Sequence, residues 1–370
     1  MRIIRLIVPL LLASCLCCHA AVHVSEHVLR YLSVDQRGDS LVLSGKVTVP
    51  QGKSPRGIIL ITHYTIYSAT EAPSVVPVKS NNEAKPFYKD YVLVMPDYIG
   101  YGATIDSVHP YLNGELTAQN CVDMYLASQQ LLDSLHTDIA TDSLYVVGYS
   151  QGGATALWTL RLLEEQYADR LTVKGCFAGS GPYDIAATYD YAVANNDAGL
   201  PVIIPMLLMG TSVSYGLDLQ QEDFFTPALS KAYETLIEPK DKGLVTIFFR
   251  MPNSRLDYWM TAYGRDKSMP QTRRMYEGLL KFSLVHYPVD NHPLGGQVIC
   301  PEWRPKAPTL IFHSTTDNVV SFFNAEHLYR CFREQPNIRY DFGNYGDHLR
   351  SLRIFQKRIL QSLKRDNLCE

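Results

Sequence analysis

The strongest constraint on the fold is a series of short, continuously apolar segments separated by a segment with helical periodicity. Residues 57–62 (GIILIT), 91–95 (YVLVM) and 144–147 (LYVV) contain few polar side chains, which is typical of strands that are covered on both faces. Residues 116–135, between the last two, carry apolar side chains at helical spacing. This order predicts an α/β fold, with a mostly parallel sheet and helices on both of its faces.

The alternation continues along the chain and is interrupted once. An outer antiparallel strand is expected at residues 41–49, a helix from residue 151 and a strand at 173–178. The pattern resumes with a strand at 309–313, a helix at 322–332, a strand at 338–342 and a helix at 349–363. Residues 183–300 show helical pieces and proline-rich turns instead. The sequence therefore predicts a core of residues 21–182 and 301–370 with an inserted cap, or lid, at 183–300.

The first twenty residues have the pattern of an export signal, in which two arginines precede an apolar stretch and small residues follow near Ala20. The stretch is too short for a permanent membrane span. Residues 12–15 (LASC) also resemble a bacterial lipobox, which would place a lipid anchor on Cys15, whereas ordinary cleavage would follow Ala20. Both alternatives predict an exported protein, either secreted or periplasmic, or anchored at the cell envelope.

Charge and cysteine content restrict the partners and the covalent links. The formal net charge is -3 and no basic run interrupts the sequence, which argues against a nucleic-acid partner. Loss of residues 1–20 would leave five of the eight cysteines, an odd number. Cys121 and Cys176 fall in apolar segments and are expected as small core residues. Cys300, Cys331 and Cys369 are the candidates for one disulfide, and the sequence does not choose among them.

The most informative motif is GYSQG at residues 148–152, which fits G-x-S-x-G. It follows an apolar strand and precedes a helix, the context in which this motif presents an exposed serine hydroxyl on a sharp turn. Ser150 is therefore the predicted nucleophile. The positive end of the following helix and the backbone N–H of Gln151 are expected to face a developing oxyanion.

A serine nucleophile needs a base to take its proton. In the α/β fold that presents the serine on such a strand-to-helix turn, the acid and then the histidine follow it along the chain. His348, between the last strand and the last helix, is the predicted base. Asp317, in the loop after the strand that resumes the sheet, is the predicted acid that orients it. Asp184, after the strand at 173–178, is the alternative acid. His313 and His327 fall within a strand and a helix and are expected to be structural.

The GYSQGG turn, the apolar strands before it and the Asp and His after it resemble the α/β-hydrolase superfamily, in particular its secreted lipases and esterases. The segments PDYIGYG (96–102) and THY (62–64) are similar to loops of that superfamily. The resemblance covers residues 40–182 and 305–365 and excludes the cap. It implies that a second oxyanion donor comes from the loop after residue 62. Tyr64 stands where many members have glycine, and its backbone N–H is the expected donor.

These features predict hydrolysis of a small-molecule or lipid ester through an acyl-enzyme, without a cofactor or a metal ion. A peptidase or amidase with the same triad is the alternative, and would favour acidic cap residues such as Glu222 or Glu238 to hold a peptide amine. A binding protein without catalysis is a third hypothesis, and predicts that Ser150 does not react with a fluorophosphonate.

Two further patterns carry less weight. Residues 23–27 (HVSEH) match the zinc pattern H-x-x-E-H, but such a site needs a helix and a third ligand. Residues 200–209 (LPVIIPMLLM) are too short and too proline-rich for a membrane span. They are expected either to pack within the cap or to line an acyl pocket.

Overall fold

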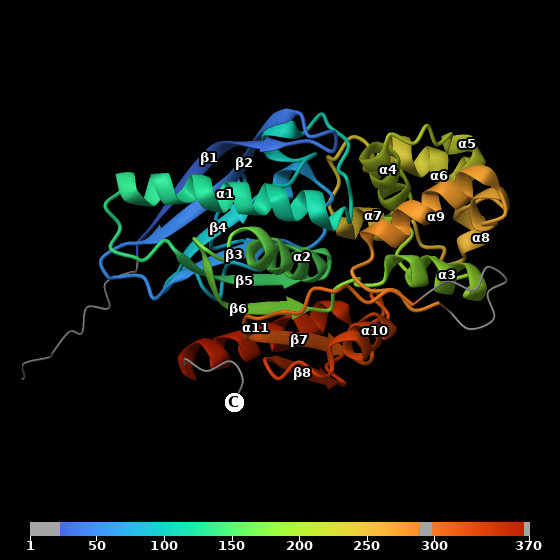
Figure 1. Cartoon of the computed structure of the whole chain (residues 1–370). Coiled ribbons are helices and arrows are strands. Elements are labelled where there is room, and N and C mark those ends of the chain that lie inside the picture. The colour runs from blue at the N-terminus through green and yellow to red at the C-terminus, as the bar shows by residue number, and fades with distance from the viewer. Residues whose placement is uncertain (1–22, 289–297, 366–370) are drawn as a thin grey trace, which may run out of the picture.

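The computed structural model describes residues 23–288 and 298–365, and these residues form one eight-stranded sheet (Figure 1). The strands are β1 (Val24–Val34), β2 (Ser40–Pro50), β3 (Ile58–Thr62), β4 (Val92–Pro96), β5 (Ser143–Tyr149), β6 (Thr172–Gly179), β7 (Thr309–Ser314) and β8 (Ile338–Gly343). Their order in the sheet is β1-β2-β4-β3-β5-β6-β7-β8. The six neighbouring strands β4-β3-β5-β6-β7-β8 are parallel, and β2 runs antiparallel to both of its neighbours, β1 and β4. The predicted α/β-hydrolase fold is confirmed.

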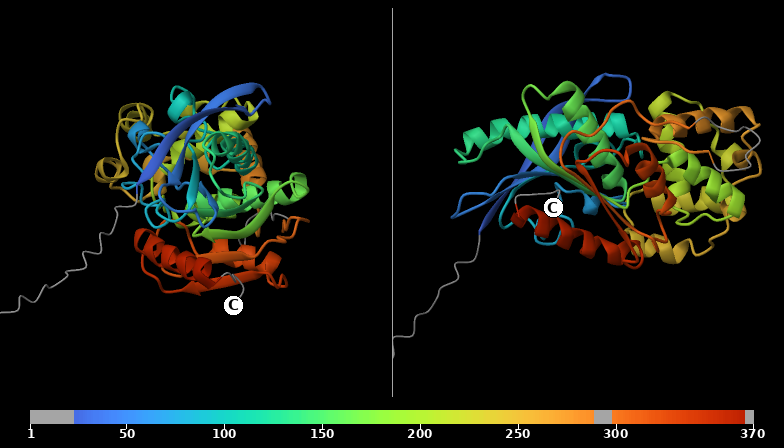
Figure 2. Two further views of the ribbon diagram at one scale, coloured as in Figure 1. Left: turned by 90° about the vertical axis from the view of Figure 1, so that its left-hand side faces the viewer. Right: turned by 60° about the horizontal axis from the view of Figure 1, so that its bottom comes forward.

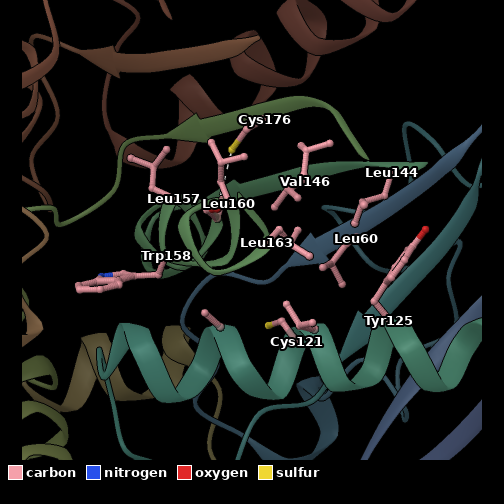
Figure 3. Close-up of a cluster of buried hydrophobic side chains, with 14 of the residues drawn as sticks. Leu60, Cys121, Tyr125, Leu144, Val146, Leu157, Trp158, Leu160, Leu163 and Cys176 are labelled. Atoms are coloured by element: carbon pink, nitrogen blue, oxygen red, sulfur yellow. Dashed lines mark hydrogen bonds between the residues drawn. The ribbon is translucent and has the colours of Figure 1, made fainter. Parts of the chain in front are cut away.

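Helices cover both faces of the sheet. On one face α1 (Gly114–Ser134) packs beside α2 (Gln151–Gln166), and on the other lies α11 (His348–Arg365). Figure 3 shows the first of these layers, in which Leu60 and Val146 of the strands meet Leu160 of α2. Cys121 of α1 and Cys176 of β6 are unpaired and fully buried in the same layer. They act there as small apolar side chains, as the sequence predicts.

The described part of the segment between β6 and β7 is mostly helical, and its apolar side chains form a separate hydrophobic cluster, which Tyr67, Tyr111 and Leu112 join from the sheet domain. Its described helices are α3 (Ile185–Asn195), α4 (Ile203–Tyr215), α5 (Gln221–Phe224), α6 (Pro227–Ala232), the π-helix η3 (Tyr233–Ile237), α7 (Leu244–Arg250), α8 (Leu256–Trp259), the 3-10 helix η4 (Tyr263–Arg265) and α9 (Pro270–Phe282). Figures 1 and 2 show this helical segment at the end of the sheet to which the parallel strands point. It therefore lies at the carboxyl ends of the parallel strands, beside the loops that follow them.

The apolar stretch at 200–209 contributes the first half of α4, whose Leu208 is buried in the core of the helical segment. Within residues 23–288 and 298–365, no helix combines the length and the apolarity that crossing a bilayer requires.

Strand β1 was not expected from the sequence. It pairs with β2 along its whole length, from Val24 opposite Pro50 to Val34 opposite Ser40. The H-x-x-E-H pattern runs into this strand, so its residues do not share a helix face. The segment alternates apolar and polar side chains only loosely, which is why the strand is hard to recognise from the sequence. β1 lies at the edge of the sheet, where the apolar Val28 and Leu32 remain exposed.

A disulfide connects the end of the helical segment to the resumed sheet domain. Of the three candidate cysteines, Cys300 is bonded to Cys331 of α10 (Phe323–Phe332). Cys369 lies outside the described residues, as do the proposed signal and Cys15. The disulfide therefore fixes the returning chain to a helix that follows β7.

Lys240 provides a second link, between the helical segment and the loop after β4. Its ammonium donates hydrogen bonds to the carbonyls of Gly100, Ile105 and Ser107, at 2.7, 2.8 and 2.7 Å. Its own carbonyl accepts from the Ala69 N–H at 2.7 Å. Burial lowers the pKa of Lys240 to about 8. All three N–H donors of the charged ammonium are thus used by one loop of the sheet domain.

We expect Lys240→Met to lower the free energy of unfolding by about 1–3 kcal/mol, because three carbonyls lose their charged donor. The variant no longer buries a charge, which offsets part of this loss. Lys242→Met is the matched control, since Lys242 is half-buried and its ammonium pairs with the exposed Asp241, at 2.6 Å. That change is expected to have an effect below about 0.5 kcal/mol. Urea unfolding measures both variants, and equal effects would contradict the role of Lys240.

Candidate active site

The turn between β5 and α2 holds Ser150 in a strained backbone conformation. Its φ and ψ are 58° and −127°, outside the regions that non-glycine residues favour. Its N–H donates to the Gly179 carbonyl at 2.8 Å. A Cβ on Gly148 would lie 2.0 Å from the Gly152 oxygen, and one on Gly152 would lie 1.9 Å from the Thr62 oxygen. Only glycine fits at these two positions, which explains the spacing of the motif.

The structure brings the hydroxyl of Ser150 into contact with His348 and Asp317. Ser150 Oγ lies 2.9 Å from His348 Nε2, and His348 Nδ1 lies 2.7 Å from Asp317 Oδ2. Asp317 reaches the site from the loop after β7, and His348 is the first residue of α11. The three side chains come from distant parts of the chain and meet at the carboxyl end of the parallel strands.

Asp317 is held in its ionised form. Burial by itself favours the neutral acid, but hydrogen bonds and charge from His348 outweigh it and keep the pKa of Asp317 below its usual range. The second oxygen of the carboxylate accepts from the N–H groups of Val319 and Val320, both at 2.9 Å. A carboxylate held in this way fixes His348 with its Nδ1 protonated, so that Nε2 is the nitrogen free to accept from Ser150.

His313 lies close to this group without joining it. Its Nε2 is 2.9 Å from the Val320 carbonyl and 3.8 Å from the Asp317 carboxylate. Burial lowers the pKa of His313 to about 4, so the ring stays neutral near pH 7. This agrees with a structural position inside β7.

The alternative acid, Asp184, belongs to a different network. Its carboxylate accepts from His286 Nδ1 at 2.9 Å, from His327 Nδ1 at 2.7 Å and from the N–H groups of Tyr287 and Ala187 at 2.8 and 2.9 Å. Despite complete burial, these donors keep the pKa of Asp184 below its usual range. The network joins the two ends of the helical segment to α10 and does not contact His348.

One of the two expected oxyanion donors is engaged elsewhere. Gln151 is the first residue of α2, where a backbone N–H has no carbonyl one turn earlier to bind. The Tyr64 N–H, in contrast, donates to both carboxyl oxygens of Glu83, each at 3.1 Å. The structure corrects the prediction for Tyr64 in this respect. The reason for the difference is the buried carboxyl of Glu83, which accepts the N–H that the sequence pattern assigned to the oxyanion.

Glu83 and His109 hold the two residues expected at the oxyanion, Tyr64 and Gln151, and neither was predicted from the sequence. Burial raises the pKa of Glu83 well above its usual range. His109 Nε2 lies 2.9 Å from the side-chain nitrogen of Gln151, and its Nδ1 lies 2.7 Å from the Ile99 carbonyl. Burial lowers the pKa of His109 to about 3, so a neutral ring donates to Ile99 and accepts from Gln151. Neither residue lies in a recognisable motif, so no sequence signal identifies them.

A pocket of about 400 Å³ lies between the loop after β4 and the helical segment. His109 forms part of its wall, so the pocket begins one side chain away from Gln151. Most of its walls are aromatic or aliphatic, and they include Tyr101, Met206, Met209, Tyr233 and Ile247. The acidic side chains in the lining are Asp106 and Glu238. The part of the chain that the structure describes holds no group of three or more His, Cys, Asp or Glu side chains suited to a metal ion.

Solved structures with the same fold include several hydrolases. A candidate hydrolase from Legionella pneumophila has 22% sequence identity and a TM-score of 0.77, over 94% of this chain and 90% of that one. The rice cell wall degrading esterase LipA from Xanthomonas oryzae has 20% identity and a TM-score of 0.75, over 94% and 92%. Candida antarctica lipase A in its closed state has 16% identity and a TM-score of 0.65, over 93% and 79%. At these identities the likeness concerns the fold.

No curated protein sequence matched the chain. The sequence model of the family described as secretory lipase matches residues 83–354, which is 272 of the 370 residues and includes the G-x-S-x-G turn, the helical segment and the loop that carries His348. Since this match covers well over half of the chain, and the fold is the one shared by esterases and lipases, the protein belongs to the secretory lipase family.

Proposed function

We propose that the protein hydrolyses carboxylic esters through an acyl-enzyme on Ser150. The observation that carries the proposal is the contact of 2.9 Å between Ser150 Oγ and a His348 ring whose other nitrogen is held by Asp317. The helical segment, within residues 183–300, acts as the cap that receives the substrate. Export through residues 1–20 is part of the proposal, supported by membership of a family described as secretory.

In the first step Ser150 Oγ attacks the ester carbonyl carbon while its proton moves to His348 Nε2. The carbonyl oxygen becomes an oxyanion, which the Gln151 N–H stabilises. The next N–H along the other loop is that of Thr65, which has no acceptor among the described residues and is our candidate for the second donor. The intermediate collapses, and the leaving alcohol takes the proton from His348. Water then repeats the sequence on the acyl-enzyme and releases the acid.

We expect Ser150→Ala to lower the turnover of an activated acyl ester by roughly 10³-fold or more, because the residue that carries the acyl group is lost. Ser134→Ala is the control, since that side chain is exposed and donates to the Leu131 carbonyl of its own helix. A fluorophosphonate should label the wild type and the control and leave Ser150→Ala unlabelled. Undiminished turnover by Ser150→Ala would contradict the proposal.

Two aspartate variants separate the proposed acid from the structural one. Asp317→Asn is expected to lower the kcat of the folded protein by roughly 10⁴-fold, because the histidine loses its orienting carboxylate. Asp184→Asn is expected to retain most of the activity of the folded fraction and to lower the free energy of unfolding by about 2 kcal/mol or more. Ester kinetics and urea unfolding of both variants test this, and the reverse pattern would make Asp184 the acid.

The stability lost in Asp184→Asn should depend on pH. The pKa of Asp184 is lower in the folded protein than the ordinary value of about 3.9, so the ionised carboxylate favours folding. Its contribution is complete above that ordinary value and disappears as the pH falls through the folded-state pKa. The difference between wild type and variant should therefore shrink below about pH 4.

The pocket beside His109 is suited to bind an apolar acyl or alcohol group of the ester, since aromatic and aliphatic side chains form most of its walls. Met206→Trp, which would fill part of it, is expected to lower kcat/KM for a long-chain ester about tenfold while an acetate ester is affected less. Met269→Trp is the control, because Met269 is similarly half-buried in the helical segment and does not line the pocket. An equal effect on both esters would remove the pocket from the proposal.

Cleavage of amides is the second candidate, and one observation favours it. Glu238 lines the pocket and could hold a peptide amine there, whereas Glu222 is exposed at α5 and is not part of its lining. Names of the structural relatives, an esterase and a lipase, favour esters. Comparing the hydrolysis of an acyl ester with that of the corresponding aminoacyl amide decides between the two.

A further inference from the structure

The backbone of His348 is held on both sides by neighbours of the other two triad residues. The His348 N–H donates to Asn318 Oδ1 at 3.2 Å, and Asn318 directly follows Asp317. The His348 carbonyl accepts from the Tyr149 hydroxyl at 2.6 Å, and Tyr149 directly precedes Ser150. Asn318, beside the acid, therefore binds the backbone N–H of His348, and Tyr149, beside the nucleophile, binds its backbone carbonyl.

Tyr149 is well suited to this contact. It is 3% exposed, and its ring packs against His348 and against Phe355 of α11, with centroids 5.1 and 5.6 Å apart. Its hydroxyl also lies 2.6 Å from Ser351 Oγ, in the first turn of α11. Burial raises the pKa of Tyr149, so the hydroxyl keeps its proton and donates it to the carbonyl. Tyr149 thus connects the end of β5 directly to the beginning of α11.

These contacts control the distance between His348 Nε2 and Ser150 Oγ, across which the proposed reaction moves a proton. Ser150 and His348 belong to separate elements, and they are 198 residues apart in the chain. A hydrogen bond from the residue before Ser150 to the backbone of His348 links the two main chains without passing through the reacting side chains. Because the imidazole swings about its own backbone, a shift of that backbone changes the distance from Nε2 to Oγ directly, and misplacement by about 1 Å can cost about a hundredfold in rate.

We propose that Tyr149 and Asn318 are positioning residues that hold the backbone of His348 in register with Ser150 and Asp317. The proposal rests on the proposed function, because it assigns these residues a role in the same reaction. It differs from a purely structural role in one respect, since the loss should fall on kcat more than on KM or on the stability of the fold.

The first test is Tyr149→Phe, which removes only the hydroxyl. We expect kcat for an acyl ester to fall about tenfold or more with KM nearly unchanged, and the labelling of Ser150 by a fluorophosphonate to slow to a similar extent. Tyr125→Phe is the matched control, because Tyr125 is also fully buried and its hydroxyl also donates to a backbone carbonyl, that of Thr141 at 2.8 Å, far from the site. It should lose similar stability and keep its kcat within about twofold.

The second test is Asn318→Ala, compared with Asn344→Ala in the neighbouring loop, where the exposed Asn344 accepts from Thr316 at 3.1 Å. We expect a smaller fall in kcat for Asn318→Ala, about threefold to tenfold, and none for the control. Combining Tyr149→Phe with Asn318→Ala should lower kcat further than either change alone.

The outcomes separate this proposal from the proposed function. An active wild type together with a Tyr149→Phe variant whose kcat matches that of Tyr125→Phe would overturn the positioning role and leave ester hydrolysis intact. A rise in KM at constant kcat would also overturn it. A wild type that neither turns over an acyl ester nor reacts with a fluorophosphonate would overturn the proposed function, and the positioning role with it.

Discussion

The turn from β5 into α2 is the constraint on which the rest of the site depends. Ser150 adopts an unfavourable backbone conformation there, and the neighbouring glycines are in contact with the main chain of β3 and of the helix that follows. Strain of this kind costs of the order of 1–3 kcal/mol and persists only where the surroundings enforce it. The surroundings in this protein are the buried strand β3, the buried end of β5 and the helix α2 that packs on them. The sheet, more than the turn itself, therefore maintains the position of the serine hydroxyl.

Hydrogen-bond partners decide which of the buried histidines can take part in proton transfer, since His348 is buried like the others. His63, His109 and His313 are buried, and burial lowers the pKa of each, to about 3 for His109 and about 4 for His313. Each of these three rings uses at least one nitrogen on a backbone carbonyl, which suits it to bracing a loop. His348 differs because a carboxylate holds one nitrogen while the other faces a hydroxyl. The chemistry of the four rings differs through their surroundings alone.

The helical segment is joined to the sheet by contacts of three kinds. Lys240 binds three carbonyls of the loop after β4, Asp184 connects both ends of the segment to α10, and the bond between Cys300 and Cys331 fixes the returning chain. Most of the hydrophobic cluster of the segment comes from its own helices, and Tyr67, Tyr111 and Leu112 of the sheet domain join it. These links and this apolar contact together hold the segment over the carboxyl ends of the strands, beside the pocket that His109 lines.

The sequence by itself determined the α/β fold, the strand-turn-helix context of Ser150 and the loops that carry Asp317 and His348, because periodicity, glycine spacing and chain order are local properties. It did not indicate β1, whose edge position weakens its alternation. Only the tertiary structure decided that Asp184 serves two other histidines, that Cys300 pairs with Cys331, and that Glu83 takes the Tyr64 N–H. These outcomes depend on competition among donors, acceptors and thiols from segments far apart in the chain. Such competition is settled by distances that exist only once the sheet and the helical segment have packed together.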